Sequence, residues 1–277
     1  MNQCSYAEID GHKIAYHRTG KGEPMLLIHG MTTWSFIWDN LLPHLAENFD
    51  VTSIDLLGCG DSDKPEDADY SISAQAEIIG KVMGKLGFEK VHLVCHDIGG
   101  GIGQIFSVRY AKRLYDLVLI NTVAYDFWPV QPIVSMRTPI IRQLAMALLD
   151  LGFFKLLVKR GVYHKERVTD EIMDLFYQPL RKERGKRAFL QLAKSLNNMQ
   201  LLSISEGLKA LQLPVLIIRG KTDIYLNAEI SEKLKRAIKN SQLEIVETGG
   251  HFIQLDEPQL LVDLIKKFIY HKNAQIK

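Results

Sequence analysis

Short, continuous apolar runs recur along the chain, and most of them are closed by a turn that contains glycine. Helix-length segments separate several of these runs, among them residues 73–86 and 229–238. Strands that are apolar throughout are typical of a parallel sheet with helices on both faces, so the pattern predicts an α/β fold. At the start of the chain, polar and apolar residues alternate around Asp10 and Gly11, which predicts a hairpin. The apolar runs are PMLLIHG, DVTSIDLLG, VHLVCHD, LYDLVLINT, PVLIIRG and LEIVETG.

The alternation of strands and helices is interrupted between residues 123 and 206. That stretch shows helical patterns and no convincing strand, and its middle part is rich in Lys and Arg. We interpret its charged segments as solvated helix faces. The sequence therefore predicts a core formed by residues 1–122 and 207–277, with a helical cap, residues 123–206, inserted after the sixth strand of the sheet.

Composition narrows the classes of partner. The chain has 34 Lys and Arg against 32 Asp and Glu, a net charge of +2, so charge indicates neither a nucleic-acid nor a membrane partner. No uninterrupted apolar run is long enough to span a membrane, and the first residues lack a signal-peptide pattern. The three cysteines have no metal-type spacing. We therefore expect a cytoplasmic protein without metal or cofactor, whose partner is a small-molecule substrate, with a homodimer left open.

The turn at Asp97, within VHLVCHDIGGGIGQ, is the motif that carries most information about chemistry. A strand turns abruptly into a helix there, and Gly99 and Gly100 leave the room that such a strained elbow needs. The N-terminal amides of the helix would favour an ionised carboxylate at the apex, and later an oxyanion. The local sequence leaves two interpretations open, a nucleophilic Asp97 and an Asp97 that only caps the helix.

Further polar residues follow other strands of the predicted sheet. His29 and Met31 lie in the turn at the end of PMLLIHG. Asp223 follows PVLIIRG, and His251 lies in a glycine loop after LEIVETG. The carboxyl ends of parallel strands meet at one edge, where sites of α/β proteins assemble. The order 97, 223, 251 is the order nucleophile, acid, histidine of one class of hydrolases. The set favours the nucleophile interpretation of Asp97.

At this point the chain resembles the α/β-hydrolase superfamily along essentially its whole length. The elbow His-Asp-x-Gly-Gly at residues 96–100 resembles that of the haloalkane dehalogenase and epoxide hydrolase branch, whose nucleophile is aspartate. The loop IDLLGCGDSDKP and Trp38 are similar to features of the same branch. The resemblance implies an Asp97 nucleophile, a His251 base and an orienting acid at Asp223. It also implies an oxyanion hole formed by the main-chain amides at the positions of Met31 and Ile98.

The sequence departs from this branch at residues that handle the leaving group. Ile98 stands where dehalogenases carry a tryptophan that grips the halide, and Met31 stands where many of them carry an asparagine. Trp128 could supply an indole instead. Thr32 replaces the proline of the epoxide hydrolase pattern, and the arginines of fluoroacetate dehalogenases are absent after Asp97. Candidate acids for an epoxide oxygen, and with Trp128 the candidate substrate-binding residues, are Tyr125, Tyr163 and Tyr177.

Other polar residues receive a structural interpretation. Asp126, just after the sixth strand, is the rival to Asp223 as the acid, and Asp223 fits the resembled acid loop better. His96 and His29 are interpreted as supports of the loops in which they lie. Cys59 and Cys95 are interpreted as small buried residues. The run GGGIG has the wrong spacing for a dinucleotide site.

These observations predict a hydrolase with an aspartyl-ester intermediate that acts on a small apolar epoxide or organohalide. Two alternatives stay open at this point. One is an esterase or lactonase that uses the same triad. The other is a hydrolase-fold binding protein that catalyses no reaction.

Overall fold

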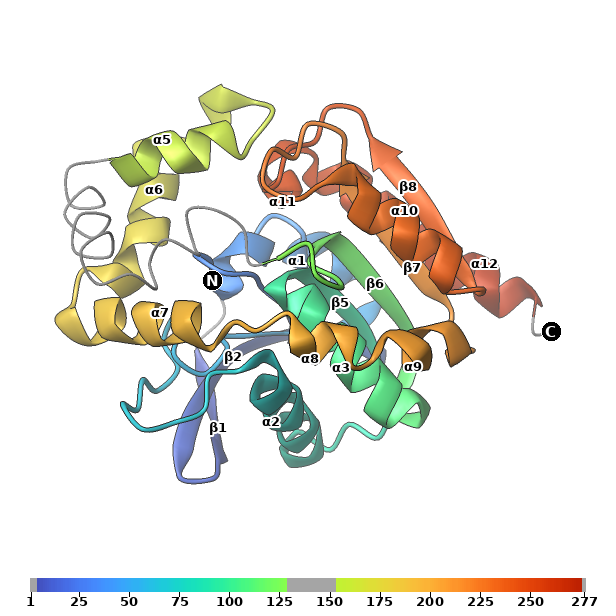
Figure 1. Cartoon of the computed structure of the whole chain (residues 1–277), viewed down its shortest axis with the longest axis horizontal. Coiled ribbons are helices and arrows are strands. Elements are labelled where there is room, and N and C mark those ends of the chain that lie inside the picture. The colour runs from blue at the N-terminus through green and yellow to red at the C-terminus, as the bar shows by residue number, and fades with distance from the viewer. Residues whose placement is uncertain (1–3, 129–152, 276–277) are drawn as a thin grey trace.

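The computed structural model describes residues 4–128 and 153–275, and it contains an eight-stranded sheet with the order β1-β2-β4-β3-β5-β6-β7-β8 (Figure 1). β1 and β2 form the predicted hairpin, and β2 also pairs antiparallel with β4. All pairs from β4 to β8 are parallel. The predicted mostly parallel α/β sheet is therefore confirmed. The strands are β1 (Ser5–Ile9), β2 (His12–Gly20), β3 (Glu23–Ile28), β4 (Phe49–Ile54), β5 (Val91–Asp97), β6 (Leu114–Thr122), β7 (Val215–Gly220) and β8 (Ser241–Val246).

Helices cover both faces of this sheet. α3 packs on β5 and β6 and contacts α2, while α10 packs on β7 and β8. α12 contacts α1 and α11, and in Figure 1 it lies on the far side of the sheet from α2, α3 and α10. Every residue of β5 and of β7 is buried, which explains the apolar residues at the centre of each strand, 93–95 in β5 and 215–218 in β7. The core helices are η1 (Ser35–Trp38), α1 (Leu42–Leu45), α2 (Ile72–Lys85), α3 (Ile98–Tyr110), η2 (Ala111–Arg113), α10 (Ala228–Ala237), α11 (Ile253–Asp256) and α12 (Pro258–Gln275).

Polar side chains cap several of the helices where the sequence places Ser, Thr or Asn before an amphipathic stretch. The Ser71 side chain accepts the amide of Ala74 at the start of α2. Asn227 accepts the amide of Glu229 at the start of α10. Each such bond satisfies a backbone donor that the helix itself leaves open. Within the described ranges, no helix is both long enough and apolar enough to cross a membrane.

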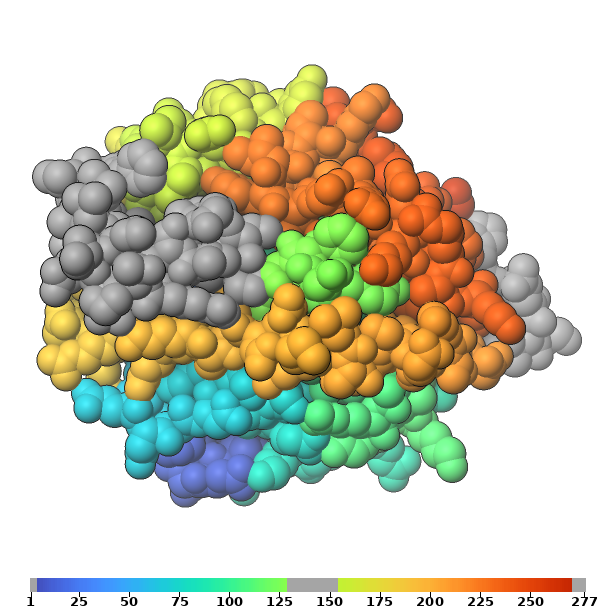
Figure 2. All heavy atoms as spheres, in the orientation of Figure 1, coloured from blue at the N-terminus to red at the C-terminus, as the bar shows by residue number. Residues whose placement is uncertain are grey.

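Between β6 and β7, the described residues form helices and no strand. α8 and α9 contact α3, so the end of this stretch lies on the core. The predicted boundary between residues 206 and 207 falls inside α9, and the division into core and cap stays a prediction. Figure 2 shows α7, α8 and α9 as a band across one face of the molecule. The helices of the stretch are α5 (Phe153–Arg160), η4 (Lys165–Arg167), α6 (Asp170–Tyr177), η5 (Gln178–Leu180), α7 (Glu183–Ser195), α8 (Met199–Leu202) and α9 (Ser205–Ala210).

Candidate active site

Asp97 lies at the sharp turn between β5 and α3. Its backbone has φ 53° and ψ −120°, a conformation that is costly for a residue with a side chain. The helix after the turn packs against neighbouring backbone, because a Cβ atom on Gly99 would lie 2.4 Å from the His29 carbonyl oxygen. A Cβ on Gly100 would lie 2.0 Å from Oγ1 of Thr122. The two glycines are therefore required for the elbow that the sequence predicted.

The Asp97 carboxylate is buried and faces backbone amides. Its Oδ2 accepts the amide of Met31 at 2.8 Å, and the amide of Ile98 also bonds the carboxylate. A Cβ on Gly30 would lie 2.6 Å from the Asp97 Cβ, so the loop before Met31 can approach only as glycine. Burial raises the pKa of Asp97, while His251 and the two amides oppose that rise. Asp97 is the N-cap residue of α3, but its side chain forms no capping bond of the usual kind, which does not support the interpretation that it only caps the helix.

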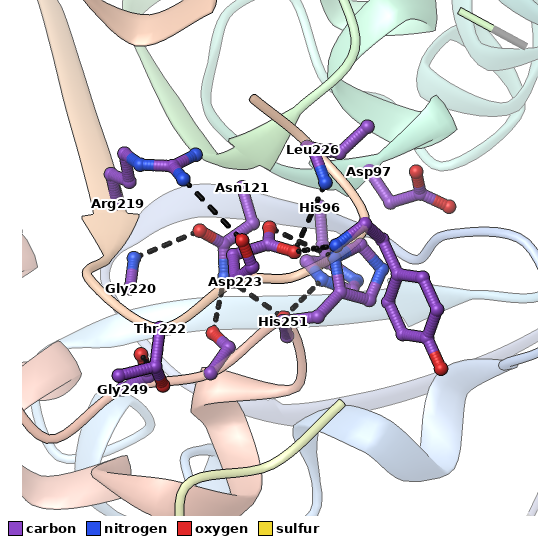
Figure 3. A network of polar contacts seen from close by, with 12 residues as sticks. His96, Asp97, Asn121, Arg219, Gly220, Thr222, Asp223, Leu226, Gly249 and His251 are labelled. Carbon is purple, nitrogen blue, oxygen red and sulfur yellow. Dashed lines mark hydrogen bonds and ion pairs between the residues drawn. The ribbon is translucent and has the colours of Figure 1, made fainter. Parts of the chain in front are cut away.

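His251 and Asp223 form a buried pair in the loops after β8 and β7. Nδ1 of His251 lies 3.1 Å from Oδ2 of Asp223. The other oxygen, Oδ1, accepts the amides of Tyr225 at 2.9 Å and Leu226 at 3.2 Å. Nη2 of Arg219 donates to the Asp223 carbonyl at 3.5 Å. These bonds fix the carboxylate so that it accepts from one defined nitrogen of His251 (Figure 3).

Within this pair, the pKa of His251 is raised and the pKa of Asp223 is lowered. Burial lowers the pKa of His251, but the carboxylates of Asp223 and Asp97 outweigh burial, and the net pKa is raised. Burial raises the pKa of Asp223, but His251 and the bonded amides outweigh it, and the net pKa is lowered. His251 is therefore a stronger base than an ordinary histidine, and Asp223 stays ionised beside it.

Asn121, near the end of β6, is part of this constellation and was missed by the sequence analysis. Its Nδ2 donates to the carbonyls of Gly250 at 2.8 Å and His251 at 2.9 Å. Its Oδ1 accepts the amide of Gly220 at 2.9 Å. One signal could have revealed it, namely a polar amide inside the otherwise apolar run LVLINT of a central strand.

His96 and His29 have the supporting positions that we predicted for them. Nε2 of His96 donates to the His251 carbonyl at 3.0 Å, and burial lowers the pKa of His96 to about 3, so the ring is neutral. Nδ1 of His29 donates to the Gly30 carbonyl at 2.8 Å, and its Nε2 accepts the amide of Leu56 at 3.0 Å. Both rings hold loop backbone at the edge of the sheet where Asp97 lies.

The rival acid and the two thiols do not join the constellation. Asp126 is exposed, whereas Nδ1 of His251 already bonds Asp223. Burial raises the pKa of Cys59 to about 12 and raises that of Cys95, so both stay protonated thiols. In residues 4–128 and 153–275, no group of three or more His, Cys, Asp or Glu side chains could hold a metal ion.

The four side chains expected to bind substrate have other partners in the structure or are exposed at the surface. The indole N–H of Trp128 donates to the Tyr125 carbonyl at 3.1 Å. The Tyr125 ring lies 4.3 Å from Nζ of Lys233 on α10. Tyr163 is 45% exposed at the surface, and the ring of Tyr177 lies 5.3 Å from that of Phe154. Contact of these four side chains with a substrate stays a prediction.

Comparison with known proteins agrees with this architecture. The model of the alpha/beta hydrolase fold family matches residues 23–258. Over 273 residues the chain is 27% identical to a cis-3-alkyl-4-alkyloxetan-2-one decarboxylase of Shewanella oneidensis, covering 94% of this chain and 86% of that protein. It is 27% identical to haloalkane dehalogenase 2 of Mycobacterium bovis, covering 92% and 91%. A solved haloalkane dehalogenase of Bradyrhizobium elkani superposes with a TM-score of 0.87 at 22% identity, covering 99% of each chain.

The fold and these similarities together define the class of the protein. Because the family model spans most of the sequence, the chain belongs to the α/β-hydrolase fold family. It is an α/β-fold hydrolase that is similar to dehalogenases and to a lactone decarboxylase.

Proposed function

We propose that Asp97 is the nucleophile of a two-step hydrolysis in which His251 is the base and Asp223 orients it. The observation that carries this proposal is the setting of the Asp97 carboxylate at the strained elbow. Its Oδ2 accepts the Met31 amide at 2.8 Å, and the charge of Asp97 acts on His251, which in turn bonds Asp223 at 3.1 Å. A nucleophile, a base that feels its charge, and an acid bonded to that base are the parts that covalent hydrolysis requires.

The first step needs no base, because an ionised carboxylate can attack carbon directly. Since Oδ2 of Asp97 is held by the Met31 amide, Oδ1 is the oxygen proposed to attack. A new bond forms between Oδ1 and a saturated carbon of the substrate, while the bond from that carbon to its leaving group breaks. The leaving group departs with the electron pair, and Asp97 becomes a neutral ester.

The second step uses water and the histidine. His251 takes a proton from a water molecule, whose oxygen attacks Cγ of the Asp97 ester. The negative charge that develops on Oδ2 is stabilised by the amides of Met31 and Ile98, which already bond the carboxylate. The Cγ–Oδ1 bond of the tetrahedral intermediate then breaks, so the substrate carbon leaves as an alcohol that carries Oδ1 and receives the proton from His251. The water oxygen stays on Cγ, and loss of its remaining proton to solvent restores the carboxylate.

The residues around the carboxylate bear on the leaving group. Met31 and Ile98 offer backbone amides, but their side chains carry no N–H that could bind a departing halide. The indole of Trp128 is already bonded to a carbonyl. A strained ring needs no halide-binding donor, because release of ring strain helps the carbon–oxygen bond to break, and the leaving oxygen of an epoxide then takes a proton. Within the proposed class of small apolar electrophiles, these residues favour a cyclic one, such as an epoxide, over a haloalkane.

A second candidate substrate is a four-membered lactone. The relative from Shewanella oneidensis is named as a decarboxylase of such a ring, and 94% of this chain aligns with it. Attack of Asp97 on the ring carbon that carries the ester oxygen would release a carboxylate, which needs neither a proton nor a halide-binding donor. This substrate therefore also fits the side chains of Met31 and Ile98.

The test is to trap the ester intermediate. We expect His251→Gln, incubated separately with 1-bromobutane, 1,2-epoxyhexane and a cis-dialkyl β-lactone, to gain the mass of one reacted substrate, with the added mass located on Asp97 after proteolysis. The matched control is His251→Gln combined with Asp97→Asn, which should gain none. An adduct names the substrate class, and carbon dioxide release by the wild type would identify a lactone decarboxylase. Absence of an adduct, together with absence of wild-type turnover, would contradict the proposal and favour a binding protein.

A further inference from the structure

We propose that Asn121 is a positioning residue that holds the backbone of His251 in register with Asp223 and thereby controls release of the covalent intermediate. The inference rests on the proposed function of Asp97 and His251. It concerns a residue on β6, a strand that supplies none of the three proposed catalytic side chains.

The Asn121 amide joins the two loops that carry the His–Asp pair. Both of its N–H groups are used, one on the carbonyl of Gly250 and one on the carbonyl of His251, at 2.8 and 2.9 Å. Its oxygen accepts the amide of Gly220, the last residue of β7, at 2.9 Å. Asp223 follows three residues after Gly220. A single side chain thus connects the backbone of the histidine loop to the start of the acid loop (Figure 3).

The local backbone is built around this contact. Asn121 is 3% exposed and has φ 38°, a left-handed conformation that asparagine tolerates better than most residues. The loops meet so closely that a Cβ on Gly220 would lie 2.2 Å from the Gly250 carbonyl oxygen. Buried carbonyls must be hydrogen-bonded, and an amide is the neutral side chain that offers two donors and an acceptor together. Asn121 therefore satisfies three backbone groups that would otherwise lack these partners.

A second side chain acts on the same carbonyl. The oxygen of His251 accepts from Nε2 of His96 at 3.0 Å as well as from Asn121. On its other side, the loop is held by Asp256, which accepts the amide of Gly250 at 2.8 Å. Because Asp256 keeps its bond when Asn121 is changed, we expect the loop to shift rather than to unfold. The shift would move the His251 ring relative to Asp223 and to the ester on Asp97.

The two proposed chemical steps should respond differently to such a shift. Formation of the ester uses the Asp97 carboxylate, which Asn121 does not touch in the described structure. Hydrolysis of the ester needs His251 placed to deprotonate water at one angle and distance. Misplacement of a reacting group by about 1 Å can slow a step by roughly 10²-fold. Replacement of Asn121 should therefore slow ester hydrolysis by about that factor and leave ester formation within a few-fold of the wild type.

The experiment measures both steps in the full chain, using the panel member that labels Asp97 in His251→Gln. Asn121→Asp keeps the shape of the side chain but replaces the NH₂ group, which donates to two carbonyls, by an oxygen that can only accept. Asn121→Ala removes all three bonds. Rapid quench followed by intact mass gives the rates at which the ester forms and decays. The control is Gln75→Ala, which removes another buried amide, one that bonds both the N–H and the carbonyl of Leu57 at 3.2 and 3.0 Å. We expect the ester to accumulate in both Asn121 variants and not in the control.

Equal slowing of formation and decay, or no slowing of either, would overturn the proposal. A measurement that needs no substrate separates this failure from failure of the proposed function. In Asn121→Ala, the ¹⁵N resonances of His251 should titrate at lower pH than in the wild type, because the ring moves away from the carboxylate of Asp223 that raises its pKa. An unchanged titration would overturn the role of Asn121 even if no panel member labels Asp97.

Discussion

Two buried histidine–aspartate pairs lie at opposite edges of the same sheet, one near the amino ends of its strands and one beyond their carboxyl ends, and only the second is near the strained turn at Asp97. His92 near the start of β5 bonds Asp116 on β6, with 2.8 Å between Nδ1 and Oδ2. His251 bonds Asp223 through the same pair of atoms at 3.1 Å. By distance and burial alone, the pair at His92 would be the stronger candidate for a catalytic dyad.

The difference lies in the second nitrogen of each ring. Nε2 of His92 bonds the carboxylate of Glu23 at 3.3 Å, so both ring nitrogens have acidic partners. In the described structure, Nε2 of His251 forms no such bond, and Asp97 lies close enough for its charge to raise the His251 pKa. A general base needs a nitrogen that can reach the substrate or water. A buried His–Asp pair can therefore serve as a catalytic base only where the second ring nitrogen is free to face the nucleophile or a water molecule.

The position on the sheet explains this difference. His92 and Asp116 are directly paired residues of β5 and β6, next to a register shift between Val91 and His92. Asp223 and His251 lie in loops beyond the carboxyl ends of β7 and β8, where side chains converge from several strands. Only at that edge does a strand end in a turn such as the one at Asp97, whose backbone conformation lifts the carboxylate towards amides of another loop.

The largest difference in turnover between the two ends of the sheet is expected for a substitution of the proposed nucleophile. Asp97→Asn should reduce turnover by at least about 10⁴-fold, because the variant can form no ester by carboxylate attack. Asp116→Asn removes the same atom from the other pair and should keep turnover within a few-fold. Both are measured as product formed per enzyme, on variants whose circular dichroism matches the wild type. Comparable losses in the two variants would contradict the distinction between the pairs.

Asp223→Asn should give the next largest effect, a loss of turnover of roughly 10² to 10⁴-fold, because His251 loses the partner that selects its tautomer. Ester formation should persist, so the intermediate should accumulate on Asp97 and be visible by mass. A variant that turns over at the wild-type rate would show that another group orients His251, with Asp126 as the first residue to examine.

The pH dependence should follow from the raised pKa of His251. Water can be deprotonated only by neutral His251, so ester hydrolysis should rise with pH through the pKa of His251, which the Asp223 carboxylate raises and which no longer includes the charge of Asp97 once the ester has formed. In Asp223→Asn, the carboxylate that raises the His251 pKa against the effect of burial is gone. The rise of the hydrolysis rate with pH should therefore occur at lower pH, while the maximal rate falls. A rise that stays at the same pH in both proteins would show that a different group is being titrated.

The smallest effect on catalysis is expected at His92. His92→Gln breaks the bonds to Asp116 and Glu23 and leaves a buried carboxylate without one partner, which should cost about 1–3 kcal/mol of unfolding free energy. Urea denaturation measures that loss, while turnover should be unchanged. Loss of turnover at full stability would mean that this end of the sheet takes part in the reaction.

The sequence was sufficient to predict the strands and those site residues that directly follow them. Continuous apolar runs indicated the parallel strands, and polar residues after those strands indicated Asp97, Asp223 and His251, because strand ends share one edge. The glycines at the elbow were readable for the same reason, since close backbone approach excludes a Cβ.

Other parts depend on tertiary contacts that no local pattern encodes. Asn121 bonds carbonyls 129 and 130 positions away, and the partners of His92 come from two other strands. The direction of an aromatic side chain depends on what packs against it, as for the Tyr125 ring beside Lys233. Residues 129–152, which belong to the predicted cap, lie outside the described residues.

The most direct test of the account is a single turnover in H₂¹⁸O with enzyme in excess over substrate. If water attacks Cγ of an Asp97 ester, the alcohol formed in the first turnover carries ¹⁶O from Asp97, and ¹⁸O appears in the peptide that contains Asp97. If ¹⁸O appears in the first alcohol and Asp97 stays unlabelled, water has attacked the substrate directly, and Asp97 is not the nucleophile.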